Sequence, residues 1–176
     1  MLNFQIFSLI FFLFLVQNII VKNMKGGNRM KAKECMCSNV YFAKPETNIQ
    51  EISRLMQKYH VGCIPICDDT NCVCGIITDR DIVLRCVACN KDLNITKASD
   101  IMSLNVCTCD ENESIERVEN KMSKNQVTRI PICDAKNHIV GIITLKDLDK
   151  NNKTIGYQNI CETVEDVCCD NTKNNG

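Results

Sequence analysis

A stretch of this chain occurs twice, in the same order and without a gap. Shifted by 66 residues, the segment 63–81 aligns with the segment 129–147. Both segments carry Ile-Pro-Ile-Cys-Asp near their start and end in Gly-Ile-Ile-Thr-x-x-Asp, and the same shift aligns a Met-x-x-Asn-Val motif at position 36 with one at position 102. Self-similarity at a fixed spacing indicates that one supersecondary unit is used more than once. We therefore expect two copies of one unit, packed as a pair.

Each copy is predicted to fold in the order strand, helix, strand, strand, helix. In the first copy, apolar residues recur at the spacing of a helix face over 49–56, after a Thr47-x-x-Gln50 capping box. Two apolar strands follow at 63–67 and 73–78, joined by a polar turn. The second copy repeats this order. The expected fold class is α/β, with two strand-helix-strand-strand-helix units packed as a pseudo-twofold pair.

The same pattern divides the chain into five segments. We expect a hydrophobic leader at 1–29, a first unit at 34–89, a polar linker at 90–99, a second unit at 100–149 and a polar tail with a weak helix at 150–176.

The charge balance removes some classes of partner. The chain has 21 Lys and Arg residues against 21 Asp and Glu residues, so no net field exists to hold nucleic acid. Its two histidines fall at a helix end and a hairpin turn, and no Ser or Cys is paired with a base in a recognisable pattern. We therefore predict no nucleic-acid binding, no enzymatic activity and no catalytic residue.

The 14 cysteines lie mostly inside apolar strand and helix patterns. Cys67 and Cys133 stand where a β-branched core residue is expected, and Cys86 and Cys89 belong to an apolar helix pattern. Because a free thiol behaves as a small hydrophobe, we expect most of them to be reduced, as in a cytoplasmic protein. The Cys-x-Cys pairs are spaced too closely for a structural zinc site, so no metal site is predicted.

The leader has two interpretations. Residues 4–21 contain five of the six phenylalanines and no charged residue. Either translation starts at Met24 or Met30 and the leader is not part of the protein, or the leader is a single membrane-anchoring helix. In the second case, the basic residues that follow it would keep the rest of the chain in the cytoplasm. We expect a cytoplasmic location, with a membrane involved only if the leader is a real anchor.

The repeated unit resembles the CBS domain, named after cystathionine β-synthase. The resemblance rests on the Ile-Pro-Ile-x-Asp strand, the Gly-Ile-Ile-Thr-x-x-Asp junction, the Asp-Ile-Met sequence at 100–102 and the tandem copy, and it covers residues 35–149. It implies that the two units form one Bateman module and that the chain is a homodimer. It also implies that AMP, ADP or ATP binds as a regulatory ligand in clefts between the units, with no cofactor required. Some members of the family bind S-adenosylmethionine or cyclic dinucleotides instead.

The strand-to-helix junctions supply the candidate site residues. At Thr78 and Asp81, a hydroxyl and a carboxylate would point at one spot, where the carboxylate can accept ribose hydroxyls and the helix start favours phosphate. The same two residues also suit an ordinary helix cap, so a structural role stays open. Matched to the family, the candidates form two sets. The favoured site comprises Arg129, Ile130, Thr144, Lys146 and Asp147, and the second, weaker or empty site comprises Ile64, Thr78, Arg80 and Asp81.

The resemblance leads to a functional expectation with one alternative. We expect a stand-alone regulatory module that senses an adenine nucleotide and passes the result to an unknown effector protein. The alternative is a ligand-free dimeric interaction scaffold that responds to thiol oxidation, which the number of cysteines keeps open.

Overall fold

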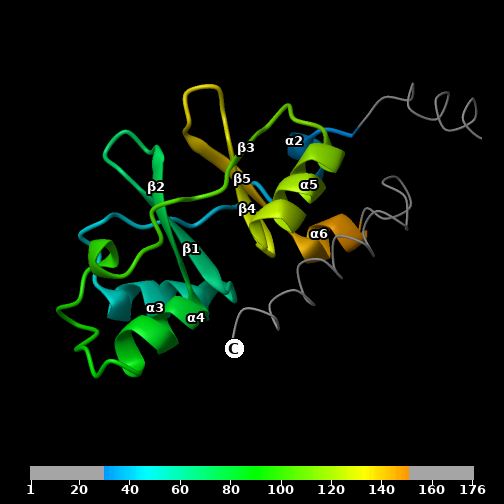
Figure 1. Ribbon diagram of the computed structural model, residues 1–176. Coiled ribbons are helices and arrows are strands. Elements are labelled where there is room, and N and C mark those ends of the chain that lie inside the picture. Colours follow the sequence, from blue (N-terminus) through cyan, green and yellow to red (C-terminus); the bar gives the residue numbers. More distant parts are fainter. Residues whose placement is uncertain (1–29, 151–176) are drawn as a thin grey trace, which may run out of the picture. The chain divides into compact units, whose positions relative to one another are not determined.

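The computed structural model describes residues 30–150 (Figure 1). The predicted leader and the polar tail after Lys150 lie outside the described residues. Within residues 30–150, no helix has both the length and the apolar character needed to cross a lipid bilayer.

The first half of the repeat is built around one hairpin. α3 (Ile49–Tyr59) precedes the antiparallel strands β1 (Cys63–Cys67) and β2 (Val73–Thr78). α4 (Asp79–Ile82) begins where β2 ends and continues into a π-helical turn, η1 (Val83–Val87).

The second half repeats this arrangement. β3 (Cys109–Asp110) pairs in parallel with β4 (Arg129–Cys133), which pairs in antiparallel with β5 (Ile139–Thr144). α5 (Ile115–Asn125) connects β3 to β4, and α6 (Leu145–Lys150) follows β5. The predicted α/β fold is therefore confirmed. The predicted order of elements is complete in the second half, whereas in the first half the leading strand is reduced to one bridge at Ala43.

The two hairpins share one hydrogen-bonding register. Cys63 pairs with Thr78 in the first hairpin, and Arg129 pairs with Thr144 in the second. Both registers shift before the last residue of the first strand. Ala43 bridges β1 in parallel and is the first-half counterpart of β3. The sequence repeat is thus also a repeat of backbone pairing.

The start of α3 differs in detail from the prediction. Asn48 caps the helix, because its side chain accepts a hydrogen bond from the Glu51 amide at 2.8 Å. The Thr47 hydroxyl instead accepts from the Lys44 amide at 3.1 Å. The predicted capping box was wrong by one residue, because Thr47 and Asn48 are both good caps and the spacing of the apolar face does not choose between them.

The segments that lead into the two units cross to the opposite halves. α2 (Ala32–Cys35) joins the second half, where its first amide donates to the Glu113 carbonyl at 2.8 Å. Its counterpart 66 residues later, the 3-10 turn η2 (Ala98–Asp100), joins the first half, where its first amide donates to the Thr47 carbonyl at 2.8 Å. Sequence assigns each lead-in to the unit it precedes, whereas the hydrogen bonds assign it to the other unit.

Each lead-in then adds an edge pairing to the hairpin of the other half. Cys37 forms an antiparallel bridge with Ile142 of β5, and Ser103 forms one with Ile76 of β2. Residues predicted as a linker also join the first half, since the Ile49 amide donates to the Thr96 carbonyl at 2.9 Å.

Two methionine–glycine contacts fix the crossed lead-ins. A Cβ atom added to Gly141 would lie 2.7 Å from Met36 Cγ, and one added to Gly75 would lie 2.9 Å from Met102 Cγ. Carbon atoms do not pack that closely, so a side chain at either glycine would force the methionine to shift from its place on the opposite strand.

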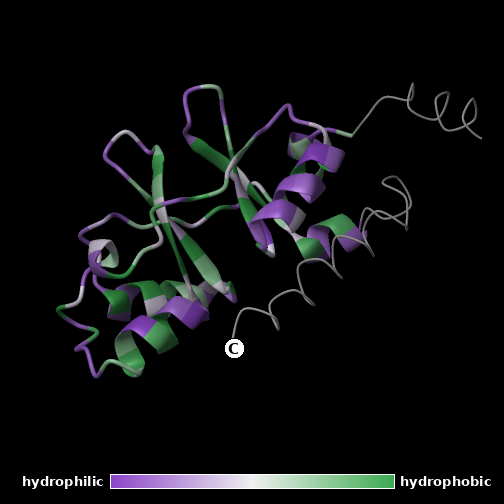
Figure 2. Cartoon of the chain, in the orientation of Figure 1, coloured by the Kyte–Doolittle hydropathy of each residue, from purple (hydrophilic) through white to green (hydrophobic). Residues whose placement is uncertain are grey.

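The core lies on the strands and on the inner faces of the helices. Figure 2 shows apolar residues along both hairpins and polar residues on the outer face of α5. The fully buried side chains are mostly isoleucines, namely Ile49, Ile52, Ile64, Ile66, Ile77, Ile130, Ile132 and Ile143.

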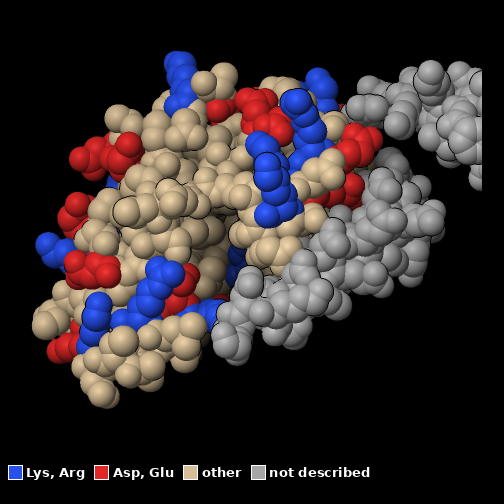
Figure 3. Space-filling model, in the orientation of Figure 1, with Lys and Arg blue, Asp and Glu red and all other residues tan. Residues whose placement is uncertain are grey.

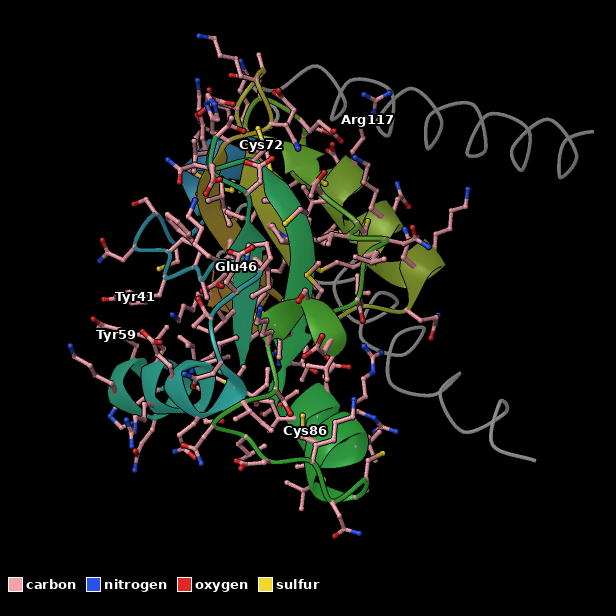
Figure 4. All side chains as sticks on the ribbon, turned by 90° about the vertical axis from the view of Figure 1, so that its left-hand side faces the viewer. Tyr41, Glu46, Tyr59, Cys72, Cys86 and Arg117 are labelled. Carbon is pink, nitrogen blue, oxygen red and sulfur yellow. The ribbon has the colours of Figure 1, made fainter. Side chains whose placement is uncertain are left out.

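Cysteines occupy core positions much as predicted. Cys67 and Cys86 are fully buried, Cys133 is 4% exposed, and none of the three takes part in a disulfide (Cys86 is labelled in Figure 4). Burial raises the pKa of the Cys67 thiol to about 12 and that of Cys133 to about 11, so both stay protonated at neutral pH. Cys89 differs from the prediction because it is exposed.

We predict that Gly141→Ala lowers the free energy of unfolding by about 1–3 kcal/mol, because the added methyl group overlaps Met36. Urea denaturation followed by circular dichroism measures the loss. Met36→Ala in the same chain removes the overlapping atoms, so the double mutant should lose less than the sum of the two single mutants. Strictly additive losses would contradict the crossed contact.

We predict that iodoacetamide at mildly alkaline pH labels the exposed Cys37 and Cys89 well before Cys67 and Cys133. The thiolate is the reactive form, and burial suppresses it at the two core positions. Peptide mass spectrometry over a time course measures the four rates. Denaturant should make the four labelling rates similar, whereas equal rates in the native protein would show that the two core thiols are accessible.

Candidate functional site

Thr78 and Asp81 form a compact polar pair where β2 becomes α4. The Asp81 Oδ2 atom accepts from the Thr78 amide at 2.8 Å and from its hydroxyl at 2.7 Å, and the Asp81 amide donates to that hydroxyl at 3.2 Å. Arg85 Nη2 lies 3.2 Å from the other carboxylate oxygen, Oδ1. The pair therefore caps α4, and its carboxylate still has lone pairs for a further donor.

Thr144 and Asp147 repeat this geometry at the start of α6. The Asp147 Oδ2 atom accepts from the Thr144 amide at 3.0 Å and from its hydroxyl at 2.6 Å. Lys150 Nζ lies 3.7 Å from Oδ1. The structural role that the sequence left open is thus present at both junctions.

Two cavities lie between the halves, and the repeat relates them. The larger has a volume of about 750 Å³ and the smaller about 210 Å³. Most residues that line the smaller cavity have a counterpart 66 residues away that lines the larger one. The wide cleft is lined by Thr78, Asp79, Arg80, Asp81, Asn105 and Arg129, among others. The narrow cleft is lined by Asn39, Tyr41, His60, Gly62, Arg129 and Thr144, among others.

The wide cleft combines polar and apolar walls. One wall is the junction of β2 and α4, where Thr78, Arg80 and Asp81 line the cleft. The facing wall is the second lead-in, near Val106, and the turn that follows α5. Its volume of about 750 Å³ lies within the range of roughly 300–1,000 Å³ that small-molecule sites usually have.

The narrow cleft is bordered by a tyrosine pair. The rings of Tyr41 and Tyr59 stack with centroids 3.4 Å apart and planes 9° from parallel, and Figure 4 shows them side by side next to α3. Lys58 Nζ lies 5.0 Å from the Tyr59 ring centroid, a cation–π distance. The volume of about 210 Å³ is below the usual range for ligand sites.

Arg129 belongs to both clefts. Its Nη1 atom donates to the Gly62 carbonyl at 2.6 Å, which joins the second half to the first. Burial raises the pKa of the neighbouring Cys63 thiol, and the Arg129 guanidinium partly offsets that rise. Cys63 and Arg129 are counterparts in the repeat, so only one of the two equivalent positions carries a charge.

The structure divides the predicted site residues into three groups. Thr78, Arg80 and Asp81 line the wide cleft together with Arg129. Thr144 lines the narrow cleft, also with Arg129. The remaining predicted residues line neither cleft: Lys146 is exposed, Asp147 is half-buried, and Ile64 and Ile130 are fully buried in the core.

Sequence reasoning missed several lining residues. Asp79 and Gln126 line the wide cleft, and Tyr41 lines the narrow one. The repeat offset could have indicated Gln126, because its counterpart is His60, the histidine at the end of the first predicted helix. Asp79 has no such signal, since its counterpart Leu145 is apolar.

Neither a metal centre nor a strong surface field marks the described part of the chain. Among residues 30–150, no group of three or more His, Cys, Asp or Glu side chains is arranged to hold a metal ion. Figure 3 shows basic and acidic side chains interspersed over the face in view. This mixture agrees with the balanced composition of the sequence.

Comparison with models of protein families matches the CBS domain twice. The two matches cover residues 32–87 and 98–153, which together are more than half of the chain. They are separated by the same offset as the sequence repeat.

Individual relatives and solved structures agree. The CBS domain-containing protein YhcV of Bacillus subtilis is 37% identical over 119 residues, which are 68% of this chain and 83% of YhcV. Inosine-5'-monophosphate dehydrogenase of Methanocaldococcus jannaschii is 32% identical over 123 residues, which are 70% of this chain and 24% of the enzyme. The CBS domain pair of protein MJ0100, solved in complex with 5'-methylthioadenosine and S-adenosyl-L-methionine, has a TM-score of 0.63 and 30% identity, covering 69% of this chain and 94% of that one.

Proposed function

The chain belongs to the CBS-domain family, and we propose that it is a regulatory CBS pair that binds an adenine nucleotide and acts on a partner protein. The solved pair from MJ0100 carries two adenosine compounds. A related fold with 30% identity makes an adenosine-based ligand the first candidate here.

The polar wall of the wide cleft carries this proposal. Thr78, Asp81, Arg80 and Arg129 all line this one cavity, so a hydroxyl, a carboxylate and two guanidinium side chains lie around it. A carboxylate can accept hydrogen bonds from both ribose hydroxyls, and guanidinium groups bind phosphate with charge-assisted hydrogen bonds. Val106, on the facing wall, offers apolar surface to a base. These groups suit AMP, ADP or ATP as the regulatory ligand.

We place the ligand in the wide cleft, although the sequence favours the set around Thr144 and Asp147. Arg129, the cation expected to serve that set, also lines the wide cleft. The narrow cleft has less than a third of the volume, and neither Lys146 nor Asp147 lines it. Volume and charge therefore both support Thr78 and Asp81 as the principal site.

A ligand-free scaffold is the second candidate function. It is favoured by the two Thr–Asp pairs, because each is complete as a helix cap without any ligand. Under that alternative, oxidation of thiols would supply the regulation. Binding of nucleotide separates the two candidates.

An exposed apolar strip supports a homodimer. Val83, Leu84 and Val87 on η1 are 55%, 51% and 58% exposed, and their spacing places them on neighbouring faces of one helix. Pairing of this strip with a second copy would remove it from water, as isologous dimers commonly do. The effector protein would then read the shape of the dimer. The buried thiols support a reducing compartment such as the cytoplasm.

We predict that Asp81→Ala weakens AMP binding by at least about tenfold, because hydrogen bonds to a charged group contribute about 1.5–3 kcal/mol each. Isothermal titration calorimetry measures the affinity, and circular dichroism checks that α4 still forms. Asp147→Ala is the matched control, since it removes the equivalent cap outside the wide cleft. AMP affinity in that variant should stay within about twofold of the wild type. If AMP does not bind at millimolar concentration, the scaffold is the better account.

We predict that Leu84→Glu and Val87→Glu convert a dimer to a monomer, because a charge buried without a partner at the interface opposes association. Light scattering after size-exclusion chromatography measures the mass. Leu104→Glu serves as the control, since Leu104 is 68% exposed and lies on the lead-in instead of on η1. A wild-type monomer, or a dimer that survives both changes, would rule out this interface.

A further inference from the structure

One wall of the wide cleft carries a carboxylate that has no counterpart in the second half. Asp79 is the first residue of α4 and lines the wide cleft. The equivalent position in the second half is Leu145, which is uncharged. Asp79 has no part in the ribose and phosphate contacts proposed above. Its Oδ1 atom accepts from the Arg80 amide at 2.8 Å at the start of α4, and its other oxygen, Oδ2, lies on the side of Arg129.

The Asp79 carboxylate lies next to the Arg129 guanidinium. A Cβ atom added to Gly62 would lie 3.0 Å from Asp79 Oδ2 and 3.1 Å from Arg129 Nη1, so the two charged groups flank the same point. The Gly62 carbonyl accepts from both residues, at 2.6 Å from Arg129 Nη1 and at 3.2 Å from the Asp79 amide. The pKa of the buried Cys63 thiol responds to both charges, in opposite directions.

This arrangement limits how much negative charge the cleft can accept. The charged side chains that line the wide cleft are Asp79, Arg80, Asp81 and Arg129, two of each sign. One phosphate group can be neutralised by the two guanidinium groups. Each further phosphate adds negative charge beside the Asp79 carboxylate, and like charges in a partly enclosed site repel each other. Repulsion of this kind is a common means of selectivity between similar ligands.

We propose that Asp79 makes the wide cleft selective for adenine ligands with one phosphate, or with an uncharged or cationic group in its place, over diphosphates and triphosphates. The inference rests on the proposed function, because it presumes an adenine ligand in this cleft. It assigns to Asp79 the role of a specificity-determining residue. Asp81 and Arg129 remain the groups that hold the ligand.

Calorimetric titration of the full chain with AMP and with ATP tests the proposal. Both titrations omit divalent cations, so that no metal ion bridges the triphosphate to a carboxylate, and both use low ionic strength. We expect the wild type to bind AMP at least about tenfold more tightly than ATP. Asp79→Asn should lower this preference by at least about fivefold, mainly by strengthening ATP binding. Added salt should narrow the preference in the wild type and leave it nearly constant in the variant.

Two further variants complete the design. Asp79→Leu introduces the residue that the second half has at the equivalent position, Leu145. It removes the same charge with a side chain that this fold accommodates there. Asp69→Asn removes a carboxylate from the β1–β2 turn, outside the cleft, and should leave the preference unchanged.

The outcomes separate this inference from the function beneath it. If neither nucleotide binds, the proposed function fails and the selectivity fails with it. If AMP binds through Asp81 but the wild type binds ATP equally well or better, the function stands and the selectivity is overturned. A preference that Asp79→Asn and Asp79→Leu both leave intact also overturns it.

Discussion

Each half of this molecule is completed by a segment that belongs, in sequence, to the other half. Met36 lies on Gly141 and Met102 lies on Gly75, so close that an added Cβ atom at either glycine would displace the methionine. The bridges of Cys37 and Ser103 then extend the two hairpins at their edges. Because both lead-ins run on from these contacts into the space between the hairpins, they also form walls of the two clefts. The clefts therefore depend on the crossing.

The two halves are more similar in their backbone geometry than in the side chains that face the clefts. Strand register, the Thr-x-x-Asp caps of α4 and α6 and the methionine contacts are the same in both halves. The side chains that face the clefts differ: where the second half has Arg129, the first has Cys63, and where the first has Tyr41, the second has Cys107. Two sites with one backbone geometry have thus acquired different volumes and different charges. A fold can be kept while one of its sites changes its ligand or loses it.

The sequence predicted those parts of the fold that depend on local pattern. The apolar runs placed both hairpins, and the Thr-x-x-Asp junctions placed the starts of α4 and α6. The crossing of the lead-ins was out of reach, because a repeat offset looks the same whether a segment packs on its own unit or on the other one. The prediction of the candidate site was partly wrong for the same reason. Thr78, Arg80 and Asp81 do line one cleft. The prediction grouped Arg129 with Lys146 and Asp147 alone, because it assumed that each cleft has its own residues, whereas Arg129 lines both clefts.

The crossed lead-ins also impose an order on folding as the chain is synthesised. The segment around Met36 emerges from the ribosome early, yet its partner Gly141 follows about a hundred residues later. The first half can be completed sooner, because Met102 lies only 27 positions after Gly75. The earliest of the crossed segments to be made is therefore the last to find its place. Until the second hairpin forms, α2 and Met36 of the nascent chain have no surface to dock on. The second half is therefore complete only after this N-terminal segment has packed against it.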